Sequence, residues 1–316
     1  MDESPPISRA GFAAIIGAPN AGKSTLTNRL VGTKVAIVTH KVQTTRFPVR
    51  GVTHHAGAQI ILVDTPGIFS ARRRLDRAMV HAAWSGADDA DAVVHLIDAA
   101  AWVASAREEA TPAQKKSLED DRAIMARLGE LGVTAIAALN KIDLFPHDAV
   151  LPIIAELNAS ALYSDIIPLS AANGDGIEPL LDRLVPLMPE SPALYPPDQA
   201  ADLPLRLMAS EITREKLMLR LHEELPYQLT VETEAWEPRK DGSVKVSQVI
   251  IVARDGHKGI VLGKGGQAVK AVGKLAREEL ADILGHPVHL FLFVKVDPKW
   301  QENRERYEGL GLDFNV

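Results

Sequence analysis

The chain has 316 residues, of which 46% are hydrophobic and 24% are charged, and its formal net charge is −6. This length is enough for two domains with a core each, and the whole-chain charge gives no sign of a nucleic-acid partner. The absence of cysteine excludes disulfides and thiolate metal sites. Without an apolar run of about 18 residues or an apolar N-terminal segment, we expect neither a membrane span nor a signal peptide, and the cytoplasm is the default location.

The first part of the chain alternates between strand-like and helix-like segments. Strands are expected at 11–16, 47–53, 58–64, 92–98, 134–140 and 165–170. The second and third are joined by a short turn around Gly57, which predicts an antiparallel hairpin, whereas the others need crossover helices and should be parallel. The sequence therefore predicts an α/β domain over residues 10–187, with a mostly parallel sheet and helices on both faces, after a disordered tail at 1–9.

A glycine-rich loop follows the first predicted strand. Residues 17–24 read G-A-P-N-A-G-K-S and precede a helix start, which is the pattern of a phosphate-binding loop rather than a chance glycine turn. The backbone N–H groups of such a loop point at a polyphosphate. We expect Lys23 to reach the β- and γ-phosphates and the Ser24 hydroxyl to bind Mg²⁺. The predicted contacts of this loop are Gly17, Ala18, Pro19, Asn20, Ala21, Gly22, Lys23, Ser24 and Thr25.

Two further loops are expected to respond to the γ-phosphate. Residues 64–67 read D-T-P-G, so Asp64 should hold Mg²⁺ through water and the Gly67 N–H should sense the γ-phosphate. In residues 41–46 one threonine should bind Mg²⁺; we favour Thr45 over Thr44, which the spacing alone does not decide, and an ordinary polar loop is the alternative. The predicted catalytic groups are Lys23, Thr45 and Gly67, the predicted metal ligands are Ser24, Thr45 and Asp64, and the neighbouring nucleotide contacts are Thr65, Pro66 and Ile68.

The next motifs indicate which nucleotide base the site binds. Residues 140–143 read N-K-I-D, and the Asp143 carboxylate could accept two hydrogen bonds from guanine, a donor pair that adenine lacks. Asn140 should tie this loop to the phosphate loop, and the Lys141 stem should cover the base. Ser170 and Ala171 follow another strand, where the Ala171 N–H could meet guanine O6. Because ligands bind at the carboxyl ends of parallel strands, the three loops together favour GTP and GDP over ATP.

Three positions near the phosphate loop are less decisive. Ile68 stands where many regulatory GTPases carry a glutamine that orients water, so we expect slow intrinsic hydrolysis that rests on positioning and charge neutralisation. Asn20 resembles an asparagine that ligates K⁺ in some GTPases. A role in shaping the loop is the equal alternative. The arginine run at 72–74 is interpreted as a solvated helix face or as a contact to RNA or the ribosome.

A second domain follows a linker. Residues 188–204 contain five prolines, which predicts an extended, semi-rigid segment and a domain boundary. Beyond it we expect a helix at 205–224, strands near 227–236 and 244–253, a helix on each side of the G-x-x-G at 263–266, and a strand at 288–296. This order resembles a type II KH domain, an α+β fold, over residues 205–300, with a C-terminal tail at 301–316.

The glycine loop of this domain has the features of a single-stranded RNA site. Its backbone lacks Cβ atoms at its ends and can press against a sugar-phosphate chain, and the following helix N-terminus favours phosphate. Residues 254–277 carry six basic residues against one acid, a net +5 that leaves −11 for the rest of the chain. A solvated helix face beside a glycine turn is the alternative. The predicted RNA-binding residues are Lys258, Gly263, Lys264, Gly265, Gly266, Lys270 and Lys274.

The motifs in this order resemble a translation-factor-class GTPase, and the match extends to the Era family of bacterial ribosome-assembly GTPases. Residues 208–217, 224–227 and 287–290 look like signatures of that family. The resemblance implies a Mg²⁺-dependent GTP hydrolase that binds the 3′ end of 16S ribosomal RNA through its KH domain. It also implies a role in assembly of the 30S subunit and in rRNA maturation. The G-K-G-G loop has a less polar middle pair than expected, which leaves the base preference open.

The resemblance also implies peripheral association with the inner membrane surface, although the sequence shows no amphipathic anchor for it. We expect a monomer that does not bind DNA. The alternative function is a nucleotide-gated scaffold that binds a protein partner or a membrane surface. An ATPase and an RNA-processing enzyme are weaker rivals, since the base-specific loop favours guanine and there is no acidic metal cluster or histidine pair for strand cleavage.

Overall fold

The computed structural model describes residues 8–71 and 73–316 and separates into two compact units. Unit 1 comprises Met1–Ala36, Thr45–Asp202 and Glu308–Val316, and unit 2 comprises Ile37–Thr44 and Leu203–Tyr307. The change of unit at Asp202 falls within the proline-rich stretch expected to be a linker. Most of the expected N-terminal tail, residues 1–7, and Arg72 of the arginine run lie outside the described residues.

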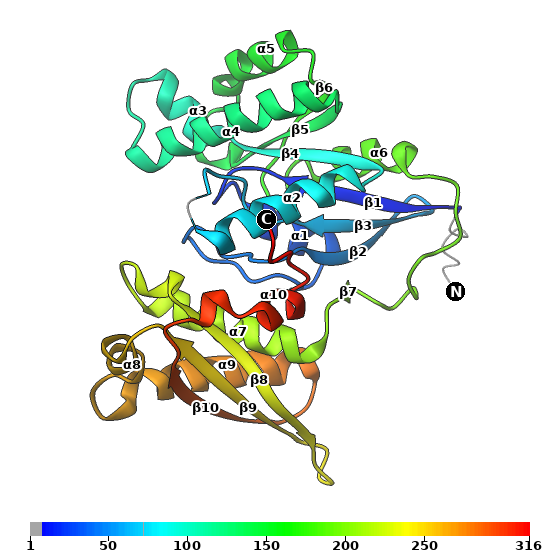
Figure 1. Ribbon diagram of the computed structural model, residues 1–316. Helices are drawn as coiled ribbons and strands as arrows, with labels where there is room; N and C mark the ends of the chain where they lie inside the picture. Colours follow the sequence, from blue (N-terminus) through cyan, green and yellow to red (C-terminus); the bar gives the residue numbers. More distant parts are fainter. Residues whose placement is uncertain (1–7, 72) are drawn as a thin grey trace. The chain divides into compact units, whose positions relative to one another are not determined.

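Unit 1 is built on a seven-stranded sheet with the strand order β6-β5-β4-β1-β3-β2-β7 (Figure 1). Its strands are β1 (Arg9–Ile16), β2 (Val49–His55), β3 (Ala58–Asp64), β4 (Ala92–Asp98), β5 (Ala135–Asn140), β6 (Tyr163–Pro168) and β7 (Ala201–Asp202). The five strands β6, β5, β4, β1 and β3 run parallel to one another, whereas β2 is antiparallel to both β3 and β7. The predicted hairpin and the predicted parallel strands are thus confirmed. Strand β2 begins after Pro48, which has no N–H to donate to a ladder.

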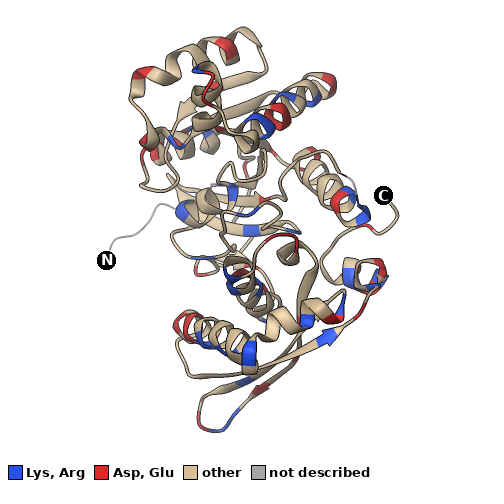
Figure 2. Ribbon diagram, turned by 90° about the vertical axis from the view of Figure 1, so that its left-hand side faces the viewer, with Lys and Arg blue, Asp and Glu red and all other residues tan. Residues whose placement is uncertain are grey.

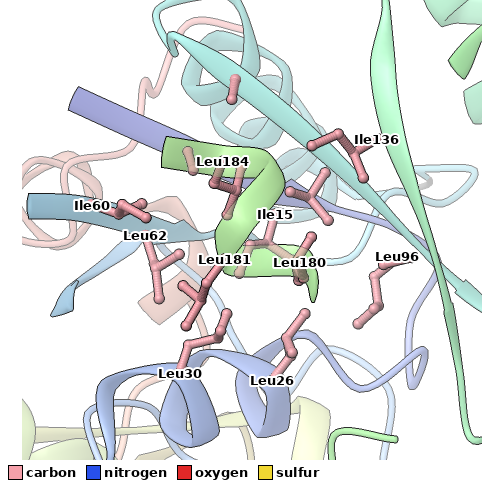
Figure 3. Packing of buried hydrophobic residues seen from close by; sticks show 14 of the residues in the cluster. Ile15, Leu26, Leu30, Ile60, Leu62, Leu96, Ile136, Leu180, Leu181 and Leu184 are labelled. Atoms are coloured by element: carbon pink, nitrogen blue, oxygen red, sulfur yellow. The ribbon is translucent and has the colours of Figure 1, made fainter. Parts of the chain in front are cut away.

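Helices cover both faces of this sheet. They are α1 (Lys23–Val31), α2 (Arg74–Asp88), α3 (Ala99–Ala106), α4 (Pro112–Leu131), α5 (Leu151–Ala159) and α6 (Ile177–Leu184). Figure 3 shows the core between α1, α6 and the sheet, where Leu26, Leu30 and Leu180 point toward strand side chains such as Ile15 and Leu96. Helices α2 and α4 pack their apolar stripes on the other face, and α3 and α5 cover β4 and β5 there.

Unit 2 has a three-stranded sheet with the order β10-β9-β8. Strand β9 pairs antiparallel with β8 and parallel with β10. Its elements are α7 (Leu205–Arg220), β8 (Leu229–Pro238), β9 (Val244–Val252), α8 (Asp255–Leu262), α9 (Gln267–Leu284), β10 (Val288–Val296) and α10 (Arg304–Gly309), the last of which ends in unit 1. The element order is the one that the sequence predicted for a KH domain. The stretch at 301–316, expected as a tail, contains α10 and the buried residues Tyr307 and Leu312.

Within the described part of the chain, no helix combines the length and the apolar character that crossing a membrane requires.

Candidate functional site

The phosphate loop lies between β1 and α1, at the carboxyl end of the central strand. Gly22 adopts φ 105°, a left-handed conformation, and a Cβ at this position would collide with the amide of Asn140. Helix α1 starts directly after it, and no side chain caps its N-terminus. The first N–H groups of the helix are therefore left for a ligand.

Lys23 is folded back onto this loop. Its Nζ donates to the carbonyl oxygens of Gly17 at 3.0 Å and Ala18 at 2.9 Å, and the side chain is buried. Burial lowers the pKa of Lys23 to about 8, against the opposing attraction of Asp64 and Asp121. A buried cation at the mouth of a ring of N–H groups is the arrangement that an anionic phosphate would stabilise.

Three hydroxyl and carboxylate oxygens meet beside Lys23. The Ser24 hydroxyl donates to Asp64 Oδ2 at 2.7 Å and lies 2.8 Å from Thr45 Oγ1, and Thr45 Oγ1 donates to Asp64 Oδ2 at 3.4 Å. Thr44 points elsewhere, with its hydroxyl 2.6 Å from that of Thr39. The structure thus brings together the three residues that the sequence named as metal ligands and leaves the Thr44 hydroxyl outside this cluster.

This cluster fits a hard divalent cation. The second carboxylate oxygen of Asp64, Oδ1, is buried without a hydrogen-bond partner, which is costly unless a cation or bound water completes it. Burial raises the pKa of Asp64 to about 6, although the Ser24 hydrogen bond and the Lys23 charge act against the shift. All three donors are oxygens, as Mg²⁺ prefers. Elsewhere in the described chain, no cluster of three or more His, Asp or Glu residues could hold a metal ion.

The base-specific loops are joined to the phosphate loop by one buried amide. Asn140 Nδ2 donates to the Ala21 carbonyl at 2.7 Å, and its Oδ1 accepts from the Ala171 N–H at 2.9 Å. The loop after β5, the loop after β6 and the phosphate loop therefore form one hydrogen-bonded body. Asp143 is exposed beside them, and Ser170 and Ala171 are buried.

Asp98 is a site residue that the sequence analysis missed. It ends β4 and accepts a hydrogen bond from Lys141 Nζ at 2.6 Å, while its other oxygen accepts from the Ala101 N–H at the start of α3. Lys141 itself has φ 71°. An acid at the carboxyl end of a parallel strand was the available signal, but no motif marks it. Asp98 holds the Lys141 stem in place beside the loop.

The loop after β3, residues 65–68, packs closely against the phosphate loop. The Ile68 N–H donates to the Gly17 carbonyl at 3.1 Å, and a Cβ on Gly67 would lie 3.0 Å from Pro19. Thr65 Oγ1 donates to the Ile15 carbonyl at 2.8 Å. The Ile68 side chain is buried in the core with Ala83 and Ala87. Asn20 is exposed with φ 64°, and Pro19 and Thr25 are partly buried.

The glycine loop of unit 2 is bare. Gly263, Gly265 and Gly266 have φ values of 70°, 59° and 75°, and a Cβ on either of the last two would meet nothing within 4 Å. Helix α9 follows without a side-chain cap. Lys264, Lys270 and Lys274 are exposed, and Lys258 is partly buried. All three basic residues of α9, Lys270, Lys274 and Arg277, precede its acids, of which the first is Glu278; Figure 2 colours both kinds on the ribbon.

The fold and both sites define a class of protein: a P-loop GTPase domain followed by a KH domain. The family model described as "50S ribosome-binding GTPase" matches residues 12–141, and the KH-domain model matches residues 224–301. The chain is 57% identical over its whole length, and that of the relative, to GTPase Era of Caulobacter vibrioides, and 52% identical to that of Maricaulis maris with the same coverage.

Two solved structures of Era extend the similarity to three dimensions. A point variant of Aquifex aeolicus Era bound to GDP and AlF₄⁻ is 37% identical, with a TM-score of 0.86 over 98% of this chain and 100% of that chain. Era in complex with MgGDPNP and nucleotides 1506–1542 of 16S ribosomal RNA is also 37% identical, with a TM-score of 0.87 and the same coverage. The chain belongs to the Era family of GTPases and hydrolyses GTP.

Proposed function

We propose that this GTPase binds the 3′ end of small-subunit ribosomal RNA through its KH domain and acts in assembly of the 30S subunit. The observation that carries the proposal is the pairing, in one chain, of an oxygen cluster beside a buried lysine with an open glycine loop that leads into a basic helix. The relative solved with MgGDPNP and 16S nucleotides 1506–1542 supports the assignment of both ligands.

In the nucleotide site, Lys23 is proposed to release the Gly17 and Ala18 carbonyls and donate to the phosphates. Ser24 and Thr45 would hold Mg²⁺ directly and Asp64 through water, and the bound ion would neutralise charge on the transferring phosphoryl group. The Gly67 N–H would meet the γ-phosphate. Because the Ile68 side chain is buried, hydrolysis rests on this positioning and charge, without a side chain that orients water.

The guanine base is proposed to lie against Lys141 with Asp143 accepting from its N1–H and amino group and the Ala171 N–H donating to O6. Asn140 and Asp98 act at one remove, since they hold Ala171 and Lys141 in place. Replacing Asp143 by Asn should weaken GTP binding and admit other purine nucleotides. Unchanged GTP affinity in that variant would contradict the assignment of this loop.

In unit 2, the loop at Gly263–Gly266 is proposed to press against the sugar-phosphate backbone, and the basic residues Lys258, Lys264, Lys270 and Lys274 to supply charge. The test is binding of a synthetic RNA with 16S nucleotides 1506–1542 across a series of salt concentrations, with the complementary strand as control. Tight, salt-dependent and strand-selective binding is expected. An RNA affinity that does not change with salt concentration, or that is equal for the complementary strand, would favour a scaffold function instead.

Two finer proposals concern ligands around this core. We propose that Asn20, exposed in the phosphate loop, binds K⁺ and that K⁺ accelerates hydrolysis; equal turnover in K⁺ and Na⁺ buffers of matched ionic strength would exclude it. Peripheral association with a membrane surface is proposed from the family resemblance alone. Flotation of the protein with anionic vesicles is expected, and its absence in both nucleotide states would remove that proposal.

A further inference from the structure

The segment Glu308–Val316 belongs to the body of unit 1, although the residues directly before it in the chain belong to unit 2. It is drawn in red and ends at the mark C in Figure 1. Leu312 in this segment is only 4% exposed, so the segment is packed and not a free tail. The sequence analysis expected only a tail here. Its contacts within unit 1 are with α2, the helix that follows the loop of Gly67.

Two contacts join the segment to the first turn of α2. The guanidinium of Arg74 lies 4.4 Å from the centroid of the Phe314 ring, an arrangement that the ring quadrupole favours. Three residues further along the same helix face, Arg77 Nε donates to the Val316 carbonyl at 3.3 Å. Arg74 belongs to the arginine run that the sequence analysis interpreted as a solvated face or an RNA contact. In the structure its guanidinium is engaged within unit 1.

A cavity lies beside the remainder of α2. It has a volume of about 430 Å³, and its lining includes Gly311 and Asp313 of the segment, His81 and Ser85 of α2, and Arg50 of β2. Close packing is what opposes the movement of a helix in a protein interior. Because this space is not filled by side chains, α2 has room to shift once its contact with the segment is lost.

Helix α2 also contacts both neighbours of Gly67. The Ile68 side chain packs with Ala83 of α2 in a buried cluster. A Cβ on Gly86 of α2 would lie 3.7 Å from Thr65 Cγ2, so the helix backbone approaches Thr65 closely. Since the residues before and after Gly67 both lie against α2, the position of this helix restricts where the Gly67 N–H points.

The loop of Gly67 lies close to the phosphate loop in this structure. The Ile68 N–H donates to the Gly17 carbonyl at 3.1 Å, and Thr45 lies in the oxygen cluster with Ser24 and Asp64. This is the arrangement that a γ-phosphate requires of both loops. The segment Glu308–Val316 holds α2 in the same structure, so it stabilises the loop near the phosphates and not a withdrawn loop.

We propose that Phe314 is a positioning residue for GTP hydrolysis: by holding α2 through Arg74, it keeps the Gly67 N–H in place for the γ-phosphate. This inference rests on the contact to the γ-phosphate proposed above for Gly67. Phe314 acts through α2 and Ile68 and does not itself touch the nucleotide. GDP lacks the γ-phosphate, so its binding does not depend on this support.

The first test compares two nucleotides. Full-length protein with Phe314→Ala is titrated with GDP and with a non-hydrolysable GTP analogue, each with Mg²⁺. Binding of the analogue should weaken about two- to fivefold and kcat should fall, while GDP binding stays the same. Phe314→Tyr keeps the ring and should restore wild-type values. The matched control is Asn315→Ala, an exposed residue of the same segment that should bind both nucleotides like the wild type.

Three results of this test would overturn the proposal. An equal loss for both nucleotides would show a general loosening of the fold. Wild-type binding and turnover in Phe314→Ala would show that the ring does not support the loop. Tighter binding of the analogue or faster turnover would show that the segment restrains the loop of Gly67 and does not position it.

The second test measures the hold on α2 directly by amide hydrogen exchange. In Phe314→Ala, exchange should become faster in α2 and remain unchanged in α1. Arg74→Gln should give the same increase, and the double variant should exceed neither single variant, because both changes remove one contact. Unchanged exchange in α2, or additive effects of the two changes, would contradict the proposal. Arg74 is exposed, so this variant tests the contact even if Phe314→Ala does not fold.

A third variant separates this inference from the function on which it rests. Gly67→Ala places a methyl group 3.0 Å from Pro19 and should weaken the analogue more than GDP. Wild-type binding by this variant would refute the proposed role of Gly67, and with it the route from Phe314 to the phosphate. Loss of the analogue in Gly67→Ala but not in Phe314→Ala would leave the proposed function intact and refute the role of Phe314.

Discussion

The phosphate loop of unit 1 and the glycine loop of unit 2 share one backbone feature, but the space around that feature is occupied in the first loop and empty in the second. Each ends on a left-handed glycine, Gly22 with φ 105° and Gly266 with φ 75°, that precedes a helix without a side-chain cap. Around Gly22 the space is filled by the Asn140 amide and, at 4.0 Å, by the Leu96 side chain. Around Gly265 and Gly266 the space is empty to 4 Å.

This difference teaches how each site obtains its selectivity. In the filled site, the contacts of Lys23, Asp64 and Asn140 are buried and shared, so the deletion of one of these side chains leaves several polar groups without partners. In the open site, the backbone and scattered surface charges act almost independently, and each contributes a screened increment. Deletions should therefore be severe and specific in the first site, and graded and salt-dependent in the second.

The largest effect is expected from Lys23→Ala. This change removes the buried charge and the hydrogen bonds that it makes to the Gly17 and Ala18 carbonyls in the free protein. Two charge-assisted bonds to phosphate are worth about 3–6 kcal/mol together, so GTP affinity should fall about 100-fold or more. Calorimetric titration with GTP analogue and GDP checks it. The control is Lys115→Ala on the exposed face of α4, which should bind both nucleotides like the wild type. Near-normal GTP affinity of Lys23→Ala would contradict the role of the buried lysine in phosphate binding.

A smaller but still large effect is expected from Asn140→Ala. The Ala21 carbonyl and the Ala171 N–H would lose their partner, at about 1–3 kcal/mol for each buried group. GDP and GTP should weaken alike, by about 10- to 100-fold, because the phosphate loop and the base loop come apart together. The control is Asn173→Ala, an exposed residue of the same region that bonds to Asp175. Loss of affinity for only one nucleotide would count against a shared hydrogen-bonded body.

The convergence of the nucleotide motifs could be predicted from the sequence because parallel strands end at one edge of the sheet. Ser24, Thr45 and Asp64 meet as expected, and the hairpin and the parallel strands were predicted from turn and crossover lengths. Asp98 could not be predicted as the partner of Lys141, since the two lie 43 residues apart and no motif joins them. The short helix α3 is rich in alanine and has little apolar contrast, so its period gave no signal.

The membership of residues 37–44 in unit 2 was equally hidden. The segment is a polar loop by composition. Arg214 and Glu215 of α7 form hydrogen bonds with its backbone, but in the sequence they look like ordinary charged positions of an amphipathic helix. Burial of those charges depends on the tertiary fold and leaves no period in the sequence. Sequence patterns thus predicted where chemistry occurs, but not which distant side chain holds it in place.

The open site is tested by adding a side chain. Gly265→Asn introduces a residue that tolerates φ 59°, and the new side chain would occupy the free space through which an RNA backbone must approach. Affinity for the RNA of 16S nucleotides 1506–1542 should fall about tenfold, with nucleotide binding unchanged. Gly285→Asn is the matched control, because Gly285 ends α9 with φ 69° and is equally open. Equal losses in the two variants would mean that backbone strain, and not access to the loop, explains the effect.

Charge at the open site is tested by salt. Lys264→Ala should lower RNA affinity at low salt and reduce the slope of log affinity against log salt by about one, since one phosphate contact is lost. An unchanged slope would place this lysine outside the RNA footprint and would narrow the open site to its backbone.

The smallest effect is expected from Asp297, whose partly exposed carboxylate pairs with Arg306 of α10 at 2.9 Å. The hydrogen bond from Arg306 holds the pKa of Asp297 below its ordinary value of 3.8. A lowered folded-state pKa means that the contribution to stability is present above 3.8 and is lost as the pH falls through the folded-state pKa. Asp297→Asn should therefore melt slightly below the wild type at neutral pH, and the difference should vanish in acid. Thermal melts at several pH values check this, and Arg306→Gln should abolish the same acid-dependent part. A difference that stays constant down to the lowest pH would show that Asp297 acts through packing, as the groups of the filled site do, and not through a screened surface charge.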